Sequence, residues 1–303
     1  MNPARIAALG LACAALAGCA VAPRGYPLTP AGQIELTAAT LDPLGAYKKV
    51  LDRARPVVFT PQARAALTPS GALRAAINTG NPLLASRGKD GRLHGVSVDL
   101  AHELARQLMV SVTLVPYPSA ARAFEGLQRG EWDVAFFAVD PARADDVAFT
   151  PPYLAFEGAV AVPARSTLQR VEDLDLPGVR VVVGKGGTYD LHLTRTLRRA
   201  TLVRAATSPV VADDMLKGGH DAAAAARSQL EADVKRLPGL RILDGTLLRS
   251  EQAMAVPRAR QDARDVLALF LDTLKESGFL DEALRRHAVS GARVEPAPQR
   301  ATR

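Results

Sequence analysis

Two short stretches of the chain carry groups suited to binding an anion. The first, VVVGKGGT at 181–188, runs from a β-branched segment through a glycine cluster to Thr188. A glycine turn before a helix leaves backbone amides free at the helix start, where anions bind, and Thr188 is a good N-cap. A tight turn capped by threonine would give the same pattern without a ligand. The spacing G-x-G-G matches neither the nucleotide P-loop nor the dinucleotide fingerprint.

The second stretch is AVDPARADDVAFTPPY at 138–153. Arg143 comes just after the apolar segment 133–139, which is typical of a buried strand in a parallel sheet. We therefore expect Arg143 near the carboxyl end of that strand, and arginine binds a carboxylate through two parallel hydrogen bonds. The alternative is a surface arginine paired with Asp145 or Asp146.

Other reactive groups are sparse. The five histidines are spread out without metal-ligand spacing, and no G-x-S-x-G motif occurs. No cysteine follows Cys19, which argues against disulfides and thiolate chemistry. We expect no metal and no cofactor. Tyr117 and Tyr189 could line a cleft or simply pack in a core.

The chain of 303 residues is 48% hydrophobic, as expected of a globular protein, and carries a net charge of +7. Its basic residues are scattered, without an aromatic-interleaved stripe. This pattern favours a solvated basic surface that attracts acidic ligands over a nucleic-acid-binding face.

The N-terminal residues 1–19 are expected to be a lipoprotein signal peptide. Arg5 precedes an apolar stretch at 6–17, which is too short to span a membrane. The stretch ends in LAGC, which resembles a bacterial lipobox and predicts lipidation of Cys19. A plain secretory peptide cut nearby is the alternative. Residues 20–70, rich in Pro, Ala and Thr, are expected to be a tether with a possible short helix.

From Leu73 onward the chain alternates strand and helix patterns. Helices are expected at 95–109, 188–199, 259–276 and 279–289. Gly130 with Asp133, and Gly218 with Asp221, precede two buried runs in the same order, so two α/β units of similar layout follow each other. Such units form parallel sheets whose ligands lie beyond the strand carboxyl ends, in a cleft between the units.

Several motifs occur together in this order over residues 71–288: DGRLHGVSVDLAHELA, GEWDVAFF, VAFTPPY and GGTYD. In wording and spacing the chain resembles the bacterial extracellular solute-binding proteins of family 3, the amino-acid-type receptors of ABC importers. The resemblance implies an α/β, type II periplasmic-binding-protein-like fold, in which two parallel-sheet lobes are joined by a two-strand hinge. The implied parts are lobe one at 71–157 plus 253–290, lobe two at 158–252, crossing strands at 156–162 and 251–257, and a disordered tail at 291–303.

The resemblance also implies a binding site. Arg143 would bind the ligand carboxylate, and Gly187 and Thr188 would donate to it from the start of the lobe-two helix. The amide of Tyr189 would point into the same cleft. The backbone around Phe137 and Ala138 would line lobe one.

The chain also departs from the family pattern. Asn81 lies in the loop where an aromatic ring is usual, and Asp140 replaces a threonine before the arginine turn. Where an aspartate would pair with a ligand ammonium, the chain has Ala225, Ala226 and Arg227. A buried ammonium without a carboxylate is costly, so a standard α-amino acid is questionable. Arg227 is either a second anion contact or a surface arginine at a helix start.

The implied function is a periplasmic, lipid-anchored monomer that passes a small carboxylate-bearing solute, an amino acid or related organic anion, to the membrane permease of an ABC importer without chemistry. One alternative is a dehydratase-like enzyme for prephenate-like acids on the same fold. Its acid or base would be Asp140, Glu157 or Asp190. The other is a ligand sensor that acts through a partner.

Overall fold

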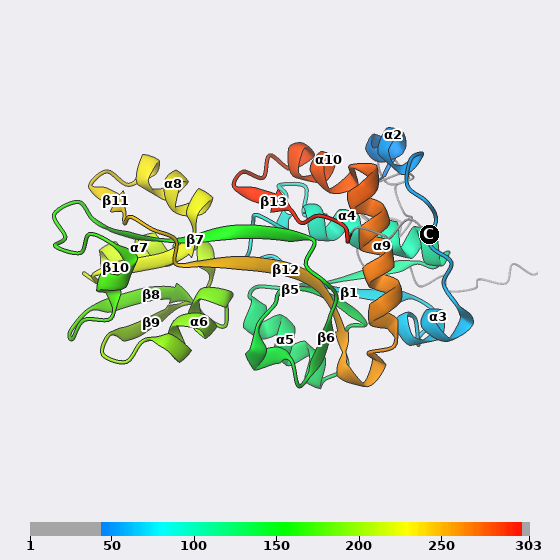
Figure 1. Cartoon of the computed structure of the whole chain (residues 1–303), viewed down its shortest axis with the longest axis horizontal. Coiled ribbons are helices and arrows are strands. Elements are labelled where there is room, and N and C mark those ends of the chain that lie inside the picture. The colour runs from blue at the N-terminus through cyan, green and yellow to red at the C-terminus, as the bar shows by residue number, and fades with distance from the viewer. Residues whose placement is uncertain (1–43, 299–303) are drawn as a thin grey trace, which may run out of the picture.

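The computed structural model describes residues 44–298 and shows two α/β lobes side by side along the long axis (Figure 1). Two long strands, β7 (Leu154–Pro163) and β12 (Leu248–Pro257), run from one lobe into the other. This arrangement confirms the predicted two-lobed class. Cys19 and the predicted signal peptide lie outside the described residues.

A single sheet of eleven strands passes through both lobes, with the order β4-β1-β5-β12-β7-β10-β8-β9 along its main path. In lobe one, β1 (Leu73–Asn78) is parallel to β4 (Val112–Tyr117) and β5 (Val134–Ala138). In lobe two, β8 (Arg180–Gly184) is parallel to β9 (Thr201–Ala205) and β10 (Ala222–Ala226). The crossing strands pair antiparallel with each other and with β5 and β10, which makes the sheet continuous.

Lobe one is covered by helices from both ends of the described chain. Its core is formed by apolar side chains of β1, β5, α4 (Val96–Leu108), α9 (Ala263–Ser277) and α10 (Phe279–Arg286). The helix predicted at 95–109 is thus confirmed almost to the residue, because its apolar positions recur at helical spacing. The helix α5 (Ala120–Gln128) ends just before Gly130, which has a φ of +62°.

Lobe two is built around the all-alanine strand β10, which is buried along its whole length. Ala222 and Ala224 pack with side chains of α6 (Thr188–Thr196), whereas Ala223 and Ala225 face Met215 and Leu230. The helices α7 (Val211–Lys217) and α8 (Arg227–Arg236) supply this second group. Small side chains therefore allow helices to approach both faces of the strand.

Shorter elements complete the described chain. They are β2 (Ser86–Arg87), β3 (Leu93–His94), β6 (Val147–Phe149), β11 (Leu240–Ile242) and the 3-10 helices η2 (Pro141–Arg143), η3 (Val171–Leu174), η4 (Ser208–Val210) and η5 (Arg258–Arg260). None of the helices in the part of the chain described is long and apolar enough to cross a membrane.

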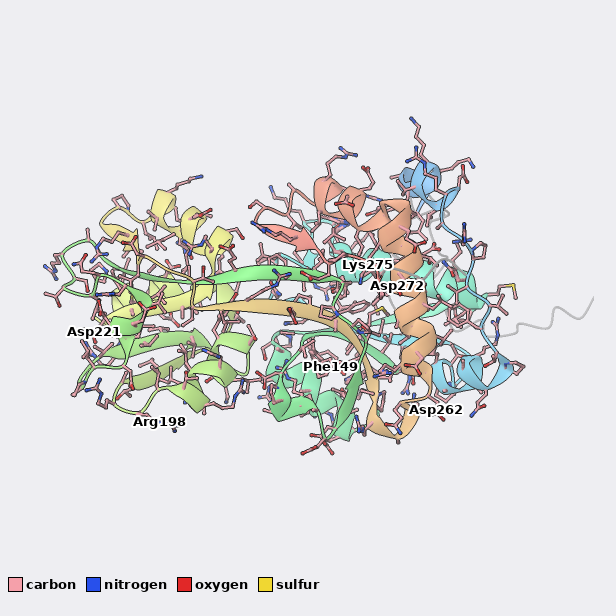
Figure 2. The ribbon with its side chains drawn as sticks, in the orientation of Figure 1. Phe149, Arg198, Asp221, Asp262, Asp272 and Lys275 are labelled. Carbon is pink, nitrogen blue, oxygen red and sulfur yellow. The ribbon has the colours of Figure 1, made fainter. Side chains whose placement is uncertain are left out.

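The repeated Gly-x-x-Asp pattern has a structural role in each lobe. Asp133 accepts hydrogen bonds from the amide and side chain of Arg74, at 3.0 and 2.9 Å, where β1 begins. Asp221 binds the amide and side chain of Arg180 in the same way, at 2.9 and 3.2 Å, where β8 begins. Asp221 lies at the end of lobe two farthest from lobe one (Figure 2). These aspartates therefore fix strand starts at the ends of the sheets opposite to any ligand.

Both ends of the described chain pack onto the fold. In the predicted tether, residues 44–70 form η1 (Gly45–Tyr47), α2 (Lys48–Leu51) and α3 (Pro61–Leu67). Tyr47 is fully buried and stacks on Phe279, with ring centroids 4.4 Å apart. The predicted disordered tail begins instead with β13 (Ala292–Val294), which pairs with β7. Apolar contacts across the fold explain both differences, since Val294 and Tyr47 join the lobe-one core.

Candidate ligand-binding cleft

A cavity lies between the lobes, where the carboxyl ends of two parallel strands of lobe one face those of two parallel strands of lobe two. Asn78, Ala138, Gly184 and Ala226, the last residues of β1, β5, β8 and β10, all line it. This is the position expected for a ligand in parallel α/β sheets. The cavity is small, with about 70 Å³ accessible to the centres of water molecules.

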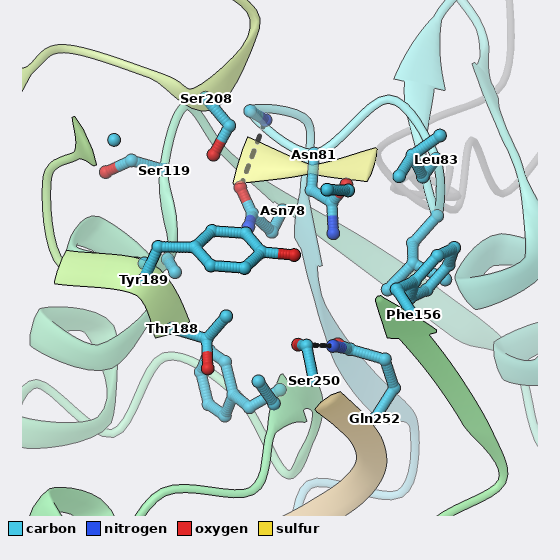
Figure 3. A pocket seen from close by; sticks show the side chains of 18 of the residues that line it. Asn78, Asn81, Leu83, Ser119, Phe156, Thr188, Tyr189, Ser208, Ser250 and Gln252 are labelled. Atoms are coloured by element: carbon cyan, nitrogen blue, oxygen red, sulfur yellow. Dashed lines mark hydrogen bonds between the residues drawn. The ribbon is translucent and has the colours of Figure 1, made fainter. Parts of the chain in front are cut away.

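Seven residues singled out in the sequence line this cavity. They are Asn81, Phe137, Ala138 and Arg143 from lobe one and Gly187, Thr188 and Tyr189 from lobe two. Figure 3 shows Thr188 and Tyr189 on one side, with Leu83 and Phe156 on the other. The fold thus brings together residues that are more than a hundred positions apart in the chain.

Arg143 is the dominant charge of the cleft. It ends η2, which begins at a proline and is capped by Asp140, whose Oδ1 accepts from the Ala142 amide at 2.9 Å. The side chain is buried and its guanidinium lies 5.0 Å from the ring centre of Phe137. The predicted alternative, a surface arginine paired with a nearby aspartate, is therefore wrong.

The Arg143 guanidinium has only peptide carbonyl acceptors in the described structure. It donates to Ala138 O at 3.4 Å and, across the cleft, to Gly186 O at 2.6 Å. No carboxylate of the described residues lies within ion-pair distance of it. Burial lowers the pKa of Arg143 to about 10, and the charge of Asp140 offsets this only in part, so the side chain stays charged at neutral pH. A buried cation of this kind favours an anionic ligand.

The glycine loop of lobe two presents the start of α6. The helix begins at Thr188 with Gly187 as its N-cap, so the prediction that Thr188 is the cap is wrong. Gly186 adopts a φ of +66°, and the Gly187 amide turns back to Gly184 O at 3.0 Å. The amides of Thr188 and Tyr189 belong to the first helical turn, where no intrahelical acceptor exists. The Thr188 hydroxyl has no hydrogen-bond partner within residues 44–298.

Asp190 holds this glycine loop in place from within lobe two. Its carboxylate accepts from the Gly186 amide at 2.8 Å and from the Thr194 hydroxyl at 3.2 Å. It also forms an ion pair with Arg204 at 3.0 Å. Asp190 is thus engaged within lobe two and does not line the cavity.

The two lobes touch at the same loop. A Cβ atom on Gly186 would lie 2.5 Å from the Cβ of Ala121, which belongs to α5 of lobe one. Only glycine permits this approach. Together with the bond from Arg143 to Gly186 O, the contact indicates that the lobes are closed over the cavity.

The two tyrosines considered from the sequence have different roles. The Tyr189 ring packs against Gly158, where a Cβ would lie 2.5 Å from its Cε1, and extends across the cavity (Figure 3). Burial raises the pKa of Tyr189, and its hydroxyl has no partner among the residues described. Tyr117 does not line the cavity, and its hydroxyl donates to Glu131 at 2.6 Å.

Two predicted contacts, Asp140 and Arg227, lie outside the cavity lining. Asp140 binds Arg195 of lobe two through two hydrogen bonds, at 2.8 and 3.0 Å. Arg227 is the first residue of α8, lies 3.3 Å from Glu157 and donates to Gly245 O, beside a separate cavity next to β13. This placement fits the alternative reading of Arg227 as an arginine at a helix start.

Several polar residues that line the cavity were not predicted from the sequence. They are Asn78, Ser97, Ser119, Thr207, Ser208, Gln229, Ser250 and Gln252. Ser250 and Gln252 lie on the same face of β12, and the Gln252 amide donates to Ser250 Oγ at 2.8 Å (Figure 3). Their alternation in the first half of this strand was a usable signal. The described residues contain no group of side chains that could hold a metal ion.

Two lobes closed over a small cavity define a receptor for a small solute. Residues 73–289 match the bacterial extracellular solute-binding proteins, family 3, and the chain belongs to that family. It is therefore an extracytoplasmic solute-binding protein. The family assignment and the fold agree with the sequence-based prediction.

Individual relatives carry more specific names. A mutant of ArgBP from T. maritima is 25% identical, with a TM-score of 0.64 over 75% of this chain and 99% of that chain. A putative binding component of an ABC transporter from Wolinella succinogenes, complexed with lysine, is also 25% identical, with a TM-score of 0.62 over 72% and 95%. Both are binding proteins.

A third relative is the cyclohexadienyl dehydratase of Pseudomonas aeruginosa. It is 28% identical over 141 residues, which cover 44% of this chain and 51% of the relative. The chain thus matches about half the length of this curated relative.

Proposed function

We propose that the protein captures a small carboxylate-bearing solute, an amino acid or related organic anion, and delivers it to the membrane permease of an ABC-type importer. The observation that carries this proposal is the buried Arg143, a cation with no acidic partner in the described structure, at the wall of the cavity between the lobes. The binding-protein relatives support the same assignment.

The proposed ligand lies between the two lobes. Its carboxylate accepts charge-assisted hydrogen bonds from the Arg143 guanidinium and from the amides of Thr188 and Tyr189 at the start of α6. A carboxylate is a stronger acceptor than the Gly186 carbonyl, which Arg143 contacts in the closed structure. Because each lobe supplies part of this contact, the solute stabilises the closed form over the open form.

Export and attachment belong to the same proposal. Lipidation of Cys19 would hold a monomeric receptor at the membrane surface while the lobes remain in the periplasm. When a detergent phase and a water phase are separated, wild type should enter the detergent phase and Cys19→Ala should stay in the water phase. The substitution should not change ligand affinity. An equal detergent partition of both proteins would contradict lipid anchoring.

A thermal-shift screen with amino acids, dicarboxylates, keto acids and peptides tests the binding function. A true ligand at a hundredfold excess over Kd should stabilise the folded protein by about 2.7 kcal/mol. Arg143→Ala should abolish this shift and leave a folded protein, because the substitution breaks no ion pair. Arg227→Ala, at the separate cavity, is the matched control and should keep the shift. An unchanged shift in Arg143→Ala would refute the anchor.

The dehydratase relative motivates a second candidate, an enzyme on the same fold. Elimination of water requires a group that transfers a proton. No Asp, Glu or His is among the described residues that line the cavity. Asp140 and Asp190 are engaged by arginines, and Glu157 lies at the separate cavity. No carboxylate or imidazole of the described residues is thus placed to transfer this proton, and we propose binding without chemistry.

Incubation with prephenate or arogenate separates the two candidates. The receptor should leave both acids unchanged over hours at micromolar protein, as followed by product absorbance. Product formation that Arg143→Ala abolishes would establish the enzyme instead. A sensor would bind the same solute but leave its uptake unchanged when the gene is deleted.

A further inference from the structure

The cavity between the lobes is positively charged. Arg143 and Lys185 are the charged side chains that line it within the described chain, and no carboxylate does. Lys185 is exposed and has no ion-pair partner among residues 44–298. The lining therefore complements negative charge on a ligand and offers none for a positive group.

Several carboxylates close in sequence to the lining have other partners. Asp140 is bound through both oxygens by Arg195. Asp190 binds the Gly186 amide and Arg204, and Glu157 lies 3.3 Å from Arg227. Recruiting any of them to a ligand would break an existing ion pair and leave an arginine without its partner.

The remaining polar groups of the lining are neutral. Thr188 and Tyr189 offer hydroxyls, and Asn81 offers an amide, and these side chains form no hydrogen bond within residues 44–298. Figure 3 shows the Tyr189 hydroxyl directed into the space that Asn81 also borders. Hydroxyls and amides both donate and accept, so they can satisfy a ligand hydroxyl or keto oxygen.

A ligand ammonium would meet only neutral acceptors in this cavity, with no opposite charge among the described lining residues. A charged group that leaves water needs an opposite charge or several acceptors, whereas a hydroxyl needs one or two neutral partners. Strand β10, which ends in Ala225 and Ala226, adds no acceptor side chain to this wall.

Given the proposed carboxylate receptor, we infer that its physiological ligand is an organic acid without an ammonium group, such as a hydroxy acid or keto acid. Arg143 binds the carboxylate, and the neutral groups of Thr188, Tyr189 and Asn81 bind the second oxygen function. The same cavity discriminates against α-amino acids of equal size.

Matched ligands test this inference. Three small acids with one carbon skeleton and a 2-amino, 2-hydroxy or 2-keto group, such as alanine, lactate and pyruvate, are titrated calorimetrically at pH 7.5, and the set is repeated with the skeletons of valine and leucine. The hydroxy or keto acid should bind at least about tenfold more tightly than the amino acid. Equal or tighter binding of the amino acid would overturn the inference and leave the carboxylate receptor standing. Failure of every acid to bind, both in this set and in the thermal-shift screen, would overturn the receptor itself.

A substitution in the lining gives an independent readout. Ala226 lines the cavity and is the N-cap of α8, a position that accepts both Asp and Asn. Ala226→Asp should shift the preference toward the amino acid by about tenfold or more relative to Ala226→Asn, which has the same shape without the charge. Equal preferences in the two variants would contradict the missing-carboxylate explanation.

Discussion

The side chain of Arg143 explains the binding site at the scale of one residue. A guanidinium that is removed from water without an acidic partner lowers the stability of the folded protein. Contact with the Phe137 and Phe124 rings, whose centres lie 5.0 and 5.8 Å away, compensates only part of that cost. An anionic ligand would supply the missing charge, which is why we place the ligand carboxylate there.

The hydroxyl of Thr188 tests how lobe two contributes to binding. Thr188→Val keeps the side-chain shape and removes the hydroxyl, so ligand affinity should fall about five- to tenfold, while Thr188→Ser should retain it. Calorimetric titration measures both, and melting temperatures without ligand should agree within about 2 °C. Wild-type affinity in Thr188→Val would mean that lobe two binds through its backbone amides alone.

At the scale of the element, helix α4 contacts residues near both ends of the described chain. Asp99 on this helix accepts a hydrogen bond from Tyr47 and lies 2.6 Å from the Nε2 atom of His287. His102, one turn further along α4, is half-buried. Desolvation lowers its pKa, although the charge of Asp99 raises it in part. The helix thus makes the stability of lobe one sensitive to pH.

The sign of this effect follows from the His102 shift. Because the pKa in the folded protein lies below the ordinary value of about 6.5, the unfolded chain binds more protons as pH falls through that range. The free energy of unfolding should therefore keep its full value above about pH 6.5. It should decrease as the pH falls below that value. His102→Gln should flatten this decrease in urea titrations at pH 7.5 and 5.5, whereas His94→Gln, at an exposed position, should not. Parallel pH profiles for wild type and His102→Gln would contradict this assignment.

At the scale of the whole molecule, several contacts join the lobes on the cleft side. They include the Asp140–Arg195 ion pair, the bond from Arg143 to Gly186 O, and the close approach of Gly186 to Ala121. Asp140 is buried, so its ion pair is less screened than one on the surface. Closure is thus stabilised by protein groups as well as by a ligand.

Removal of this ion pair should favour the open form. Asp140→Asn keeps the oxygen that caps η2 but loses the charge, and ligand affinity should fall about three- to tenfold as the closed population decreases. Small-angle X-ray scattering should give a larger radius of gyration for the unliganded variant. Arg285→Gln, which removes an exposed pair within lobe one, is the control and should leave affinity and scattering unchanged. Identical scattering and affinity for Asp140→Asn and wild type would exclude this role.

The sequence by itself determined the alternation of strands and helices, the buried strand that precedes Arg143, and the family. These features follow from residue patterns within short segments, such as the apolar spacing of α4. The tertiary structure alone decided which charged side chains pair with each other outside the cleft. Asp140 meets Arg195 at a distance of 55 positions, and Arg227 meets Glu157 at 70 positions. Such pairings depend on how lobes and crossing strands pack together, because a charged side chain takes the partner that the fold brings within reach and not the one nearest in sequence.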